Sequence, residues 1–309
     1  MNNAKPALVG VDWGTSSFRA YLIAGDGAIL DTIESADGIS TVPPGGFPDT
    51  YRRLVGAWLD AYPGLPAIAS GMVGSRNGWR EAPYALCPAD PATIAAGLVS
   101  VEAEGARVHL VPGLAYEDEM RRPDVMRGEE VEILGIADAG AQLVVLPGSH
   151  SKWAEIAGGR VLRFRTFVTG ELFAAVRDHT LFGAFARAAR PEEPGPAFAL
   201  GARAGASATR GEGGSGFIGS LFSVRTLPLM GKLAEEDAAD YLSGLMIGAE
   251  IAEGERLFQT GAPQIAGAPA LVGRYLAAFA ALERHASAAP RLAAARGLFL
   301  LSRSAGLIA

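Results

Sequence analysis

The chain has 309 residues, of which 49% are hydrophobic and 19% are charged. This length can bury one large core or two moderate ones, so we expect two packed lobes. The formal net charge of −6 argues against the broad basic surface that nucleic-acid binders need, so any phosphate chemistry should be local.

The first part of the chain is predicted to form an α/β lobe. Residues 7–12 form a short apolar run and residues 17–23 alternate in polarity, which together predict a β-hairpin. A third strand is expected over 28–33. Apolar residues recur at helical spacing between 50 and 62, and 67–69 suggests a buried strand. Strands interleaved with helices indicate an α/β architecture.

The opening pattern starts again half a chain later. Residues 142–156 combine an apolar strand, a glycine-containing turn and an alternating strand, and another strand is expected over 161–168. Two copies of strand-turn-strand suggest a duplicated lobe.

The rest of the chain is predicted to be mainly helical. Residues 187–216 are rich in Ala, Gly, Pro and Arg, and only a short helix at 197–204 is expected there. A helical stripe of apolar residues runs from 237 to 257 and is followed by a strand-like segment at 264–267. Further helices are expected over 274–285 and 292–301.

A turn of small residues follows the first predicted strand and contains Asp12, Gly14, Thr15 and Ser16. Gly14 lets the backbone approach a ligand, and the hydroxyl and amide groups can hold phosphate oxygens. A carboxylate at Asp12 can position hydrated Mg²⁺. The alternative is an ordinary hairpin turn in which Asp12 bonds to its own backbone.

A second turn of this kind contains Gly148, Ser149, His150 and Lys152. Its serine and backbone amides can cradle phosphate, and Lys152 can neutralise charge that builds up during phosphoryl transfer. His150 fits either a hydrogen-bonding structural role or a catalytic one.

Two adjacent carboxylates, Glu129 and Glu130, precede a helix-like apolar pattern. One of them could accept the proton of a sugar hydroxyl as it attacks the γ-phosphate. Alternatively, both could simply favour a helix N-terminus through the helix dipole.

Three further segments offer ligand contacts. Arg76, Asn77 and Trp79 lie in a glycine-rich loop that could hold a sugar acid, and Arg165 at a strand end could face the same site. A mobile surface loop and a solvated strand edge are the alternatives. Gly267 joins a strand to a helix and could let an adenine ring approach, or it could form a structural turn.

No membrane-spanning or secretory segment is expected. Residues 1–14 lack the pattern of a signal peptide, and the apolar stretch at 297–309 is too short and too interrupted to span a bilayer. We therefore expect a cytoplasmic protein. The one cysteine, Cys87, has no second cysteine for a disulfide or a metal cluster, and is expected to be a small buried apolar residue.

Six motifs occur in order along the chain: VDWGTSS, GMVGSRNGW, VMRGEE, LPGSHSKW, FRTFVTGEL and LSGLMIGAE. Together they resemble the motif series of the 2-dehydro-3-deoxygalactonokinase family, with a weaker continuation at IAGAPALVGRY. This family is similar to the actin, hexokinase and Hsp70 ATPase superfamily. The resemblance implies an α/β fold with two RNase H-like lobes, at 1–137 and 138–290, and an interdomain nucleotide cleft. A C-terminal helix near 291–309 would pack back on the first lobe.

The resemblance also implies roles for the motifs. The Asp12–Ser17 turn would be the first phosphate loop, Pro147–Lys152 the second, and Gly267 part of the adenosine pocket, with ATP and Mg²⁺ as cofactors. Many relatives in the superfamily have an Asp before the first glycine of the second loop. This chain has Leu146 and Pro147 there, so metal handling would rest on Asp12.

The Gly-Glu-Glu segment followed by a phosphate loop also resembles the exopolyphosphatase branch, which supports Glu129 or Glu130 as the base. The C-terminal match is poorer, because residues 288–291 replace the usual Gly-Asp-Thr before the last helix.

The implied reaction moves the γ-phosphate of ATP to the terminal hydroxyl of 2-dehydro-3-deoxy-D-galactonate, giving the 6-phosphate in galactonate catabolism. The alternatives are a kinase for another 2-keto-3-deoxy sugar acid and an exopolyphosphatase-like phosphohydrolase, which the acidic composition disfavours. A nucleotide-binding switch or filament protein would need an assembly surface for which 309 residues leave little room. The expected partners are the sugar acid and ATP, with neither nucleic acid nor membrane, and a homo-oligomer stays open.

Overall fold

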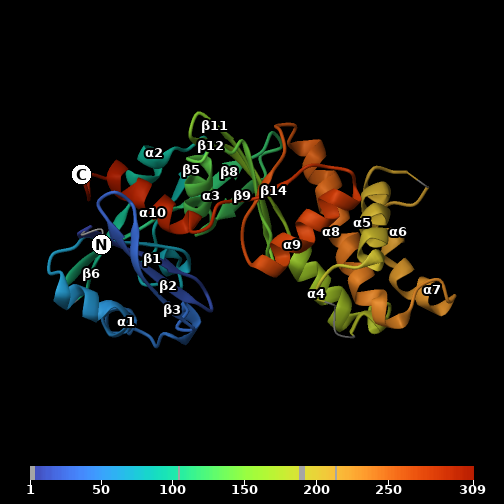
Figure 1. Ribbon diagram of the computed structural model, residues 1–309, viewed down its shortest axis with the longest axis horizontal. Coiled ribbons are helices and arrows are strands. Elements are labelled where there is room, and N and C mark those ends of the chain that lie inside the picture. Colours follow the sequence, from blue (N-terminus) through green and yellow to red (C-terminus); the bar gives the residue numbers. More distant parts are fainter. Residues whose placement is uncertain (1–3, 104, 188–191, 213) are drawn as a thin grey trace. The chain divides into compact units, whose positions relative to one another are not determined.

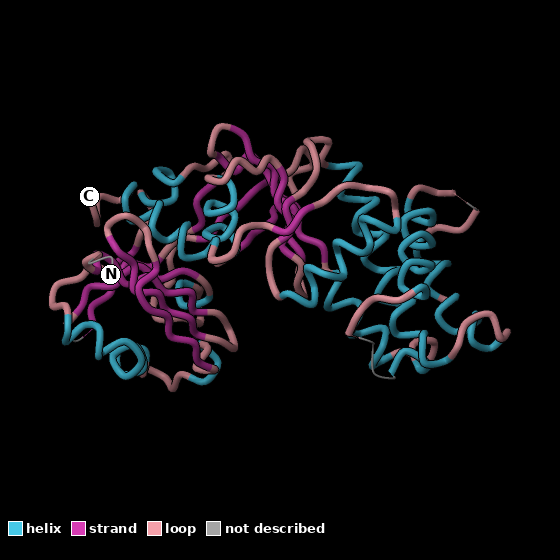
Figure 2. The backbone as a smooth tube through the Cα atoms, in the orientation of Figure 1, coloured by secondary structure: helices cyan, strands magenta, loops and turns pink. Residues whose placement is uncertain are grey.

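The computed structural model describes residues 4–103, 105–187, 192–212 and 214–309 (Figure 1, Figure 2). The chain forms two compact units. Unit 1 contains Met1–Gly140, Ile156–Phe164 and Pro290–Ala309, and unit 2 contains Ala141–Glu155 and Arg165–Ala289.

Residues 138–140 and 156–164 thus group with unit 1, whereas the sequence analysis placed them in the second lobe. Residues 156–164 group with unit 1 because they contact other residues of that unit. Val161 forms a β-bridge with Ala89, and the ring of Phe164 lies 6.1 Å from that of Tyr116.

The main sheet of unit 1 has the order β3-β2-β1-β4-β7-β6. Its strands are β1 (Pro6–Trp13), β2 (Phe18–Ala24), β3 (Ile29–Ser35), β4 (Ala67–Ser70), β6 (Val99–Ala103) and β7 (Ala106–Leu110). β1 runs antiparallel to β2, which confirms the predicted hairpin, and parallel to β4. This register places Asp12 between Arg19 on β2 and Ser70 on β4, so β1 and β4 end at the same edge of the sheet.

Helices cover this sheet. They are α1 (Phe47–Ala61), α2 (Pro91–Ala95), α3 (Glu129–Ala137) and α10 (Ala293–Ser304), with short 3-10 helices η1 (Ile39–Thr41) and η2 (Met72–Gly74). The apolar side of α1 packs into the core through Tyr51, Val55 and Trp58. α10 packs on α3 backbone to backbone at both ends of α3, since a Cβ on Gly135 would lie 2.0 Å from the Ala293 oxygen and one on Gly297 would lie 1.9 Å from the Val131 oxygen. The first turn of α3, which carries the Glu-Glu pair, is therefore firmly placed.

A second, small sheet of unit 1 was absent from our sequence prediction. It has the order β5-β8-β9 and consists of β5 (Tyr84–Leu86), β8 (Gly113–Glu117) and β9 (Pro123–Met126). Cys87 follows β5 and donates its N–H to the Ala115 oxygen at 2.9 Å. The side chain is only half-buried, and burial raises the pKa of the thiol to about 12. β9 leads directly into α3.

A second large sheet repeats the pairing pattern of the main sheet of unit 1. Its order is β12-β11-β10-β13-β14, with β10 (Leu143–Leu146), β11 (Ser151–Ala157), β12 (Arg160–Phe167), β13 (Gln264–Ile265) and β14 (Ser287–Ala288). β10 runs antiparallel to β11 and parallel to β13, as β1 does to β2 and β4. The predicted repeat of strand-turn-strand is present.

Helices make up the rest of unit 2. They are α4 (Thr169–His179), α5 (Pro196–Thr209), α6 (Phe217–Leu221), α7 (Ser223–Leu229), α8 (Ala238–Leu257) and α9 (Pro269–Ala281), with 3-10 helices η3 (Ala184–Arg187) and η4 (Glu235–Asp237). α8 is buried on all sides and packs closely on α5. A Cβ on Gly244 would lie 2.0 Å from the Phe198 oxygen, and one on Gly205 would lie 1.9 Å from the Leu245 oxygen.

Two helix predictions need correction. α5 is longer than the expected 197–204, because Gly205, Ala206 and Ala208 are also buried and Gly205 packs against α8. α9 begins at Pro269 and not near 274, since proline is favoured in the first turn of a helix. Of the segment 187–216, residues 188–191 and 213 lie outside the described residues.

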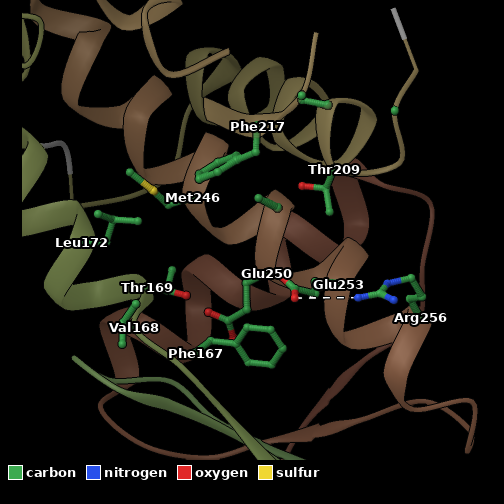
Figure 3. A pocket seen from close by; sticks show the side chains of 14 residues that line it. Phe167, Val168, Thr169, Leu172, Thr209, Phe217, Met246, Glu250, Glu253 and Arg256 are labelled. Atoms are coloured by element: carbon green, nitrogen blue, oxygen red, sulfur yellow. Dashed lines mark ion pairs between the residues drawn. The ribbon is translucent and has the colours of Figure 1, made fainter. Parts of the chain in front are cut away.

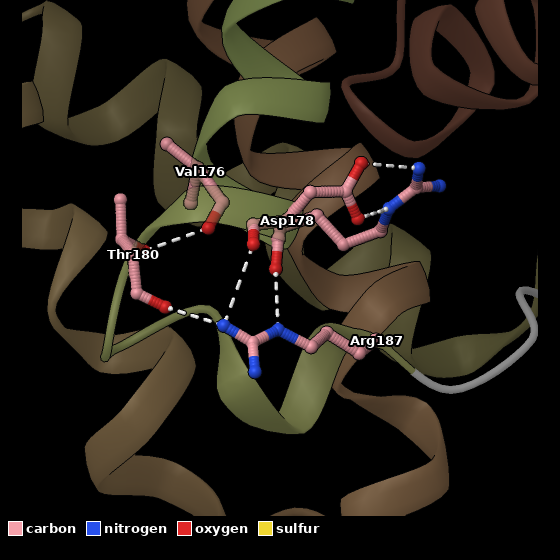
Figure 4. A network of polar contacts seen from close by, with 5 residues as sticks. Val176, Asp178, Thr180 and Arg187 are labelled. Carbon is pink, nitrogen blue, oxygen red and sulfur yellow. Dashed lines mark hydrogen bonds and ion pairs between the residues drawn. The ribbon is translucent and has the colours of Figure 1, made fainter.

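Figure 4 shows how the end of α4 is held. Arg187 donates to the carbonyl oxygens of Arg177, Asp178 and Thr180 at 3.3, 3.4 and 3.3 Å. The Thr180 hydroxyl donates to the Val176 oxygen at 2.7 Å. Because the last carbonyls of a helix lack intrahelical partners, these bonds stabilise α4.

In the described part of the chain, no helix has the length and apolar character that a membrane span requires.

Candidate active site

The ends of β1 and β4 and the start of α3 meet in unit 1. Gly71 follows β4 with φ +93°, and a Cβ there would lie 2.7 Å from the Trp13 oxygen and 3.3 Å from Asp12 Oδ1. Gly128 precedes α3 with φ +108°, and its Cβ would lie 3.1 Å from the Gly71 Cα. Only glycine combines this conformation with such a close approach. The two glycines therefore bring α3 next to the Asp12 carboxylate.

The two adjacent glutamates differ sharply. Glu130 is fully buried. Its Oε2 accepts the Gly128 N–H at 2.6 Å, while its Oε1 has no hydrogen-bond partner in the described chain. Burial, reinforced by the charge of Glu129, raises the pKa of Glu130 to about 8. Glu129 is half-buried and accepts the Arg127 N–H at 3.0 Å. The structure thus turns one carboxyl inward and leaves the other partly open.

Asp12 lies beside this turn. Burial raises the pKa of its carboxyl, the Arg19 guanidinium lowers it, and the Glu129 charge raises it. Among the described residues no hydrogen bond joins the Asp12 carboxylate to the turn backbone, so the alternative of a self-bonded hairpin turn does not hold.

Asp12 can contribute to a metal site in one coordination mode. No group of three or more His, Cys, Asp or Glu side chains in the described residues is arranged to hold an ion. Mg²⁺ commonly keeps several waters and binds through one or two carboxylates plus substrate phosphates. A lone Asp12 carboxylate is compatible with that mode and not with an all-protein cage.

Glu132 is a site residue that our sequence analysis missed. It is half-buried, and burial followed by the charge of Asp12 raises its pKa to about 7. Arg19 lowers that pKa, and Glu129 raises it further. Glu129 and Glu132 share a helix face because they are three positions apart. The three-residue spacing from Glu129 is the sequence feature that could have pointed to Glu132.

The first loop is braced by the segment after β3. The Gly14 oxygen accepts the Ile39 N–H at 3.0 Å, and the Thr15 oxygen accepts the Ser40 N–H at 3.0 Å. The Thr15 and Ser16 side chains are exposed. The loop therefore has a fixed backbone with hydroxyl groups open to a ligand.

The glycine-rich loop borders a separate cavity of about 410 Å³, lined by Arg76, Asn77, Trp79 and residues 42–45, 47 and 48. Arg76 and Asn77 are exposed, and Arg76 lies 3.7 Å from Glu81. The Trp79 ring stacks on Phe47 at 6.2 Å. Trp79 thus contributes to the core of unit 1 as well as to the cavity.

In unit 2, the second loop packs against the start of α4. A Cβ on Gly170 would lie 2.4 Å from the Gly148 oxygen, and the Glu171 N–H donates to the Ser149 oxygen at 3.1 Å. His150 Nε2 lies 2.6 Å from Glu171 Oε2. This contact agrees with the hydrogen-bonding role considered for the histidine.

Lys152 lies deeper than the sequence suggested. Its side chain is 4% exposed, and its Nζ donates to the His150 oxygen at 3.2 Å. Its ammonium therefore lies beneath the loop. The junction between β13 and α9 adjoins the same loop, since a Cβ on Gly267 would lie 3.5 Å from the Pro147 oxygen. Arg165 is half-buried on β12.

A buried polar network lies behind the loop, and our sequence analysis missed its central residue, Glu250. The Glu250 carboxylate accepts the Trp153 indole N–H at 2.8 Å and the Tyr275 hydroxyl at 2.6 Å. Tyr275 also contacts the Ser151 hydroxyl at 2.9 Å. Burial raises the pKa of Glu250, and these hydrogen bonds lower it. The network ties β11, α8 and α9 together beneath the loop.

Two cavities of unit 2 share Thr169. The smaller, about 220 Å³, is lined by Gly148, Ser149, Ser243, Leu271 and Tyr275 among others. The larger, about 580 Å³, appears in Figure 3 with Met246, Phe217 and Leu172 on one side and Glu250 and Phe167 on the other. Arg256 and Glu253 at its edge are 3.9 Å apart. The smaller cavity directly adjoins the second loop.

The predicted site residues therefore form three groups. In unit 1, Asp12, Gly14, Glu129 and Glu130 lie around one edge of the main sheet, while Arg76, Asn77 and Trp79 lie at their own cavity. In unit 2, residues 148–152 and Gly267 lie together.

Comparisons with known proteins agree over most of the chain. A family model described as 2-keto-3-deoxy-galactonokinase matches residues 12–301. The probable 2-dehydro-3-deoxygalactonokinase of Rhizobium meliloti (strain 1021) is 43% identical over 249 residues, 78% of each chain. The 2-dehydro-3-deoxygalactonokinase of Escherichia coli (strain K12) is 32% identical over 277 residues, 89% of each chain.

Solved structures give the same picture. The crystal structure of a candidate 2-dehydro-3-deoxygalactonokinase from Sinorhizobium meliloti matches with a TM-score of 0.85 and 36% identity, covering 96% of this chain and 98% of that one. The activator of 2-hydroxyisocaproyl-CoA dehydratase from Clostridium difficile, with bound ADPNP, matches with a TM-score of 0.50 and 12% identity, covering 97% of this chain and 96% of that one. The second likeness concerns the fold alone, and the predicted α/β class with two RNase H-like units is confirmed.

Proposed function

Because the chain belongs to the 2-keto-3-deoxy-galactonokinase family, we propose that it transfers the γ-phosphate of ATP to 2-dehydro-3-deoxy-D-galactonate and forms the 6-phosphate. The observation that carries this proposal is the pairing, in a chain of this family, of Asp12 at the end of β1 with Glu129 at the start of α3. Phosphoryl transfer needs a group that positions metal and phosphate and another that receives the proton of the hydroxyl.

Glu129 is the base in this proposal. Glu130 is fully buried and holds the Gly128 N–H, so its carboxyl has no route to a sugar hydroxyl. Glu129 is partly open and close enough to Asp12 to raise the pKa of that carboxyl. A positioned general base contributes roughly 100- to 10,000-fold to the rate.

The two loops would hold the nucleotide. Gly14, Thr15 and Ser16 offer backbone and hydroxyl groups in unit 1, and the Asp12 carboxylate would help to hold Mg²⁺. When bound, Mg²⁺ neutralises charge on the transferring phosphate.

In unit 2, Gly148 and Ser149 would contact phosphates at the 220 Å³ cavity. Lys152 would act from beneath the loop as a fixed positive charge, and Gly267 would border the adenosine. The position of Gly267 beside Pro147 of the second loop supports its place next to the nucleotide.

The sugar acid would contact Arg76 and Asn77, which line the 410 Å³ cavity of unit 1. Arg165 would contribute from β12. Trp79 would support the cavity wall through its stacking on Phe47.

A substrate panel tests the proposal. The purified chain is supplied with ATP, Mg²⁺ and a series of 2-keto-3-deoxy sugar acids, and ADP and sugar phosphate are measured together. We expect acid-dependent ADP release with stoichiometric formation of the 6-phosphate. ADP release that ignores the acid would indicate a phosphohydrolase and refute the kinase.

A pair of variants tests the base. Glu129→Gln is expected to lower kcat by roughly 100- to 10,000-fold with the KM for ATP unchanged. The matched variant Glu130→Gln should retain most activity. A larger loss of kcat in Glu130→Gln than in Glu129→Gln would assign the base to Glu130.

A further inference from the structure

The guanidinium of Arg127 is enclosed next to the candidate base and lacks acceptors for most of its N–H groups. Nη2 donates to the Ala82 oxygen at 2.8 Å, and the guanidinium carbon lies 4.4 Å from the centre of the Tyr84 ring. Nε and Nη1 are both buried and have no hydrogen-bond partner in the described chain. A guanidinium carries five N–H donors, so much of its capacity is unused.

No carboxylate in the described residues forms an ion pair with Arg127. Burying a cation without an anion or enough acceptors is costly, and buried charges are normally paired. The Glu130 carboxyl does not fill this role, since no ion pair joins it to the guanidinium in the described chain, and burial raises its pKa to about 8 although Arg127 lowers it. Arg127 therefore has the features of a site for an anion supplied from outside the chain.

The surroundings of Arg127 belong to the proposed sugar-acid site. Gly74, in the glycine-rich loop, packs against the guanidinium, since a Cβ there would lie 3.2 Å from Nη1. The backbone N–H of Arg127 bonds to Glu129 Oε2 at 3.0 Å. Arg127 thus joins the loop assigned to the sugar acid and the carboxylate assigned as base.

We propose that Arg127 binds the carboxylate of the sugar acid and is the residue that selects acids over neutral sugars. This inference rests on the proposed function. A guanidinium pairs with a carboxylate through two parallel N–H bonds, which gives strength and orientation. Such a pair would fix the acid end of the substrate relative to Glu129.

Arg76, to which the sequence analysis gave the carboxylate, is less suited. Its side chain is 85% exposed and lies 3.7 Å from Glu81. An exposed arginine pair is screened by water and contributes little. The buried nitrogens of Arg127 are closed to solvent, so the carboxylate reaches them only when part of the loop at 72–79 gives way.

The test compares two substrates in matched variants. The substrates are 2-dehydro-3-deoxy-D-galactonate and its C1 amide, which keeps the shape and removes the charge. The variants are Arg127→Met and Arg127→Lys, with Arg107→Met, at an exposed position outside the proposed site, as the control. Measurements are kcat/KM with each substrate, binding of the acid by calorimetry, and thermal melting together with ADPNP binding as checks of folding.

Loss of one charge-assisted pair should lower kcat/KM for the acid by roughly 10- to 100-fold. We expect this loss in Arg127→Met, with the amide little affected, and an intermediate loss in Arg127→Lys. Arg107→Met should keep the preference for the acid.

Equal losses for acid and amide in Arg127→Met would mean that the residue only supports the loop, and would overturn the proposal. Calorimetry separates this failure from failure of the proposed function. A wild-type chain that binds the acid through Arg127 but does not phosphorylate it would contradict the kinase activity alone. Undiminished binding to Arg127→Met, or no binding to wild type, would overturn the Arg127 assignment.

Discussion

Replacement of Glu130 by Gln tests whether this buried carboxyl keeps its proton at neutral pH. Burial raises its pKa from the ordinary value of 4.5 to about 8, with the charge of Glu129 as the second cause. Between these values the unfolded chain has lost the proton that the folded chain keeps, so folding becomes less favourable as pH rises. Below pH 4.5 both states are protonated, and the side chain brings no such penalty.

The size of the effect follows from that interval. At about 1.4 kcal/mol for each pH unit, the range from 4.5 to about 8 corresponds to a loss of stability on the order of 5 kcal/mol. Glu130→Gln keeps the shape and an acceptor for the Gly128 N–H but cannot ionise. The variant should therefore gain stability relative to wild type from pH 5 to pH 8 and gain little more above that.

Urea unfolding at several pH values measures the difference. Tryptophan fluorescence is a suitable probe, because Trp13, Trp58 and Trp79 all lie in unit 1. Glu236→Gln makes the same chemical change at an exposed position and serves as the control. Parallel stability curves for Glu130→Gln and wild type between pH 5 and pH 9 would refute the assignment of a retained proton.

Three further predictions, two of them with a matched second substitution, concern the packing around the candidate sites. Gly128→Ala should destabilise the chain by about 1–3 kcal/mol in urea unfolding and lower kcat, because the backbone has φ +108° and faces another backbone. Gly140→Ala, at φ +93° with open space around it, should show the smaller cost of strain alone and keep kcat. Arg274→Met should cost about 3–5 kcal/mol by leaving buried Asp240 without its partner at 2.7 Å, and the added change Asp240→Leu should restore much of that in thermal melting. Gly170→Ala should raise the KM for ATP, since its Cβ would lie 2.4 Å from a carbonyl oxygen of the second loop, and an unchanged KM would contradict a nucleotide role for that loop.

Local patterns were enough to predict the framework of both sheets. The hairpin of β1 and β2 and its counterpart of β10 and β11 each combine an apolar strand, a small-residue turn and a second strand, and these signs are contained within about 20 residues. The helix α8 was also predicted from its apolar stripe, but its burial on all sides was not. That burial depends on close contact with α5, which the periodicity of one helix does not reveal.

The site was predictable only in part. The sequence placed Asp12 among its candidates because it ends an apolar run and precedes a turn of small residues, and the Glu-Glu pair because two adjacent carboxylates precede a helix-like apolar pattern. It could not identify Glu250, whose partners Trp153 and Tyr275 lie 97 and 25 residues away. Nor could it separate a surface arginine from an enclosed one. Arg127 owes its enclosure to β5 and the loop before it, and strands of three to five residues leave little pattern to detect.

The two glutamates of the Glu-Glu pair have different roles, one in the backbone turn and the other, as proposed, in the reaction. The inner carboxyl of Glu130 holds the Gly128 N–H at 2.6 Å and so fixes a turn that only glycine forms easily. Because burial keeps this carboxyl neutral at pH 7, it adds no second negative charge beside Glu129. In the proposed reaction, the outer carboxylate of Glu129 would then carry the charge needed to draw a proton from a hydroxyl. The carboxylates of Asp12, Glu129 and the sugar acid would repel one another if nothing neutralised them. Bound Mg²⁺ near Asp12 and the proposed contact of Arg127 with the sugar acid would both reduce this repulsion.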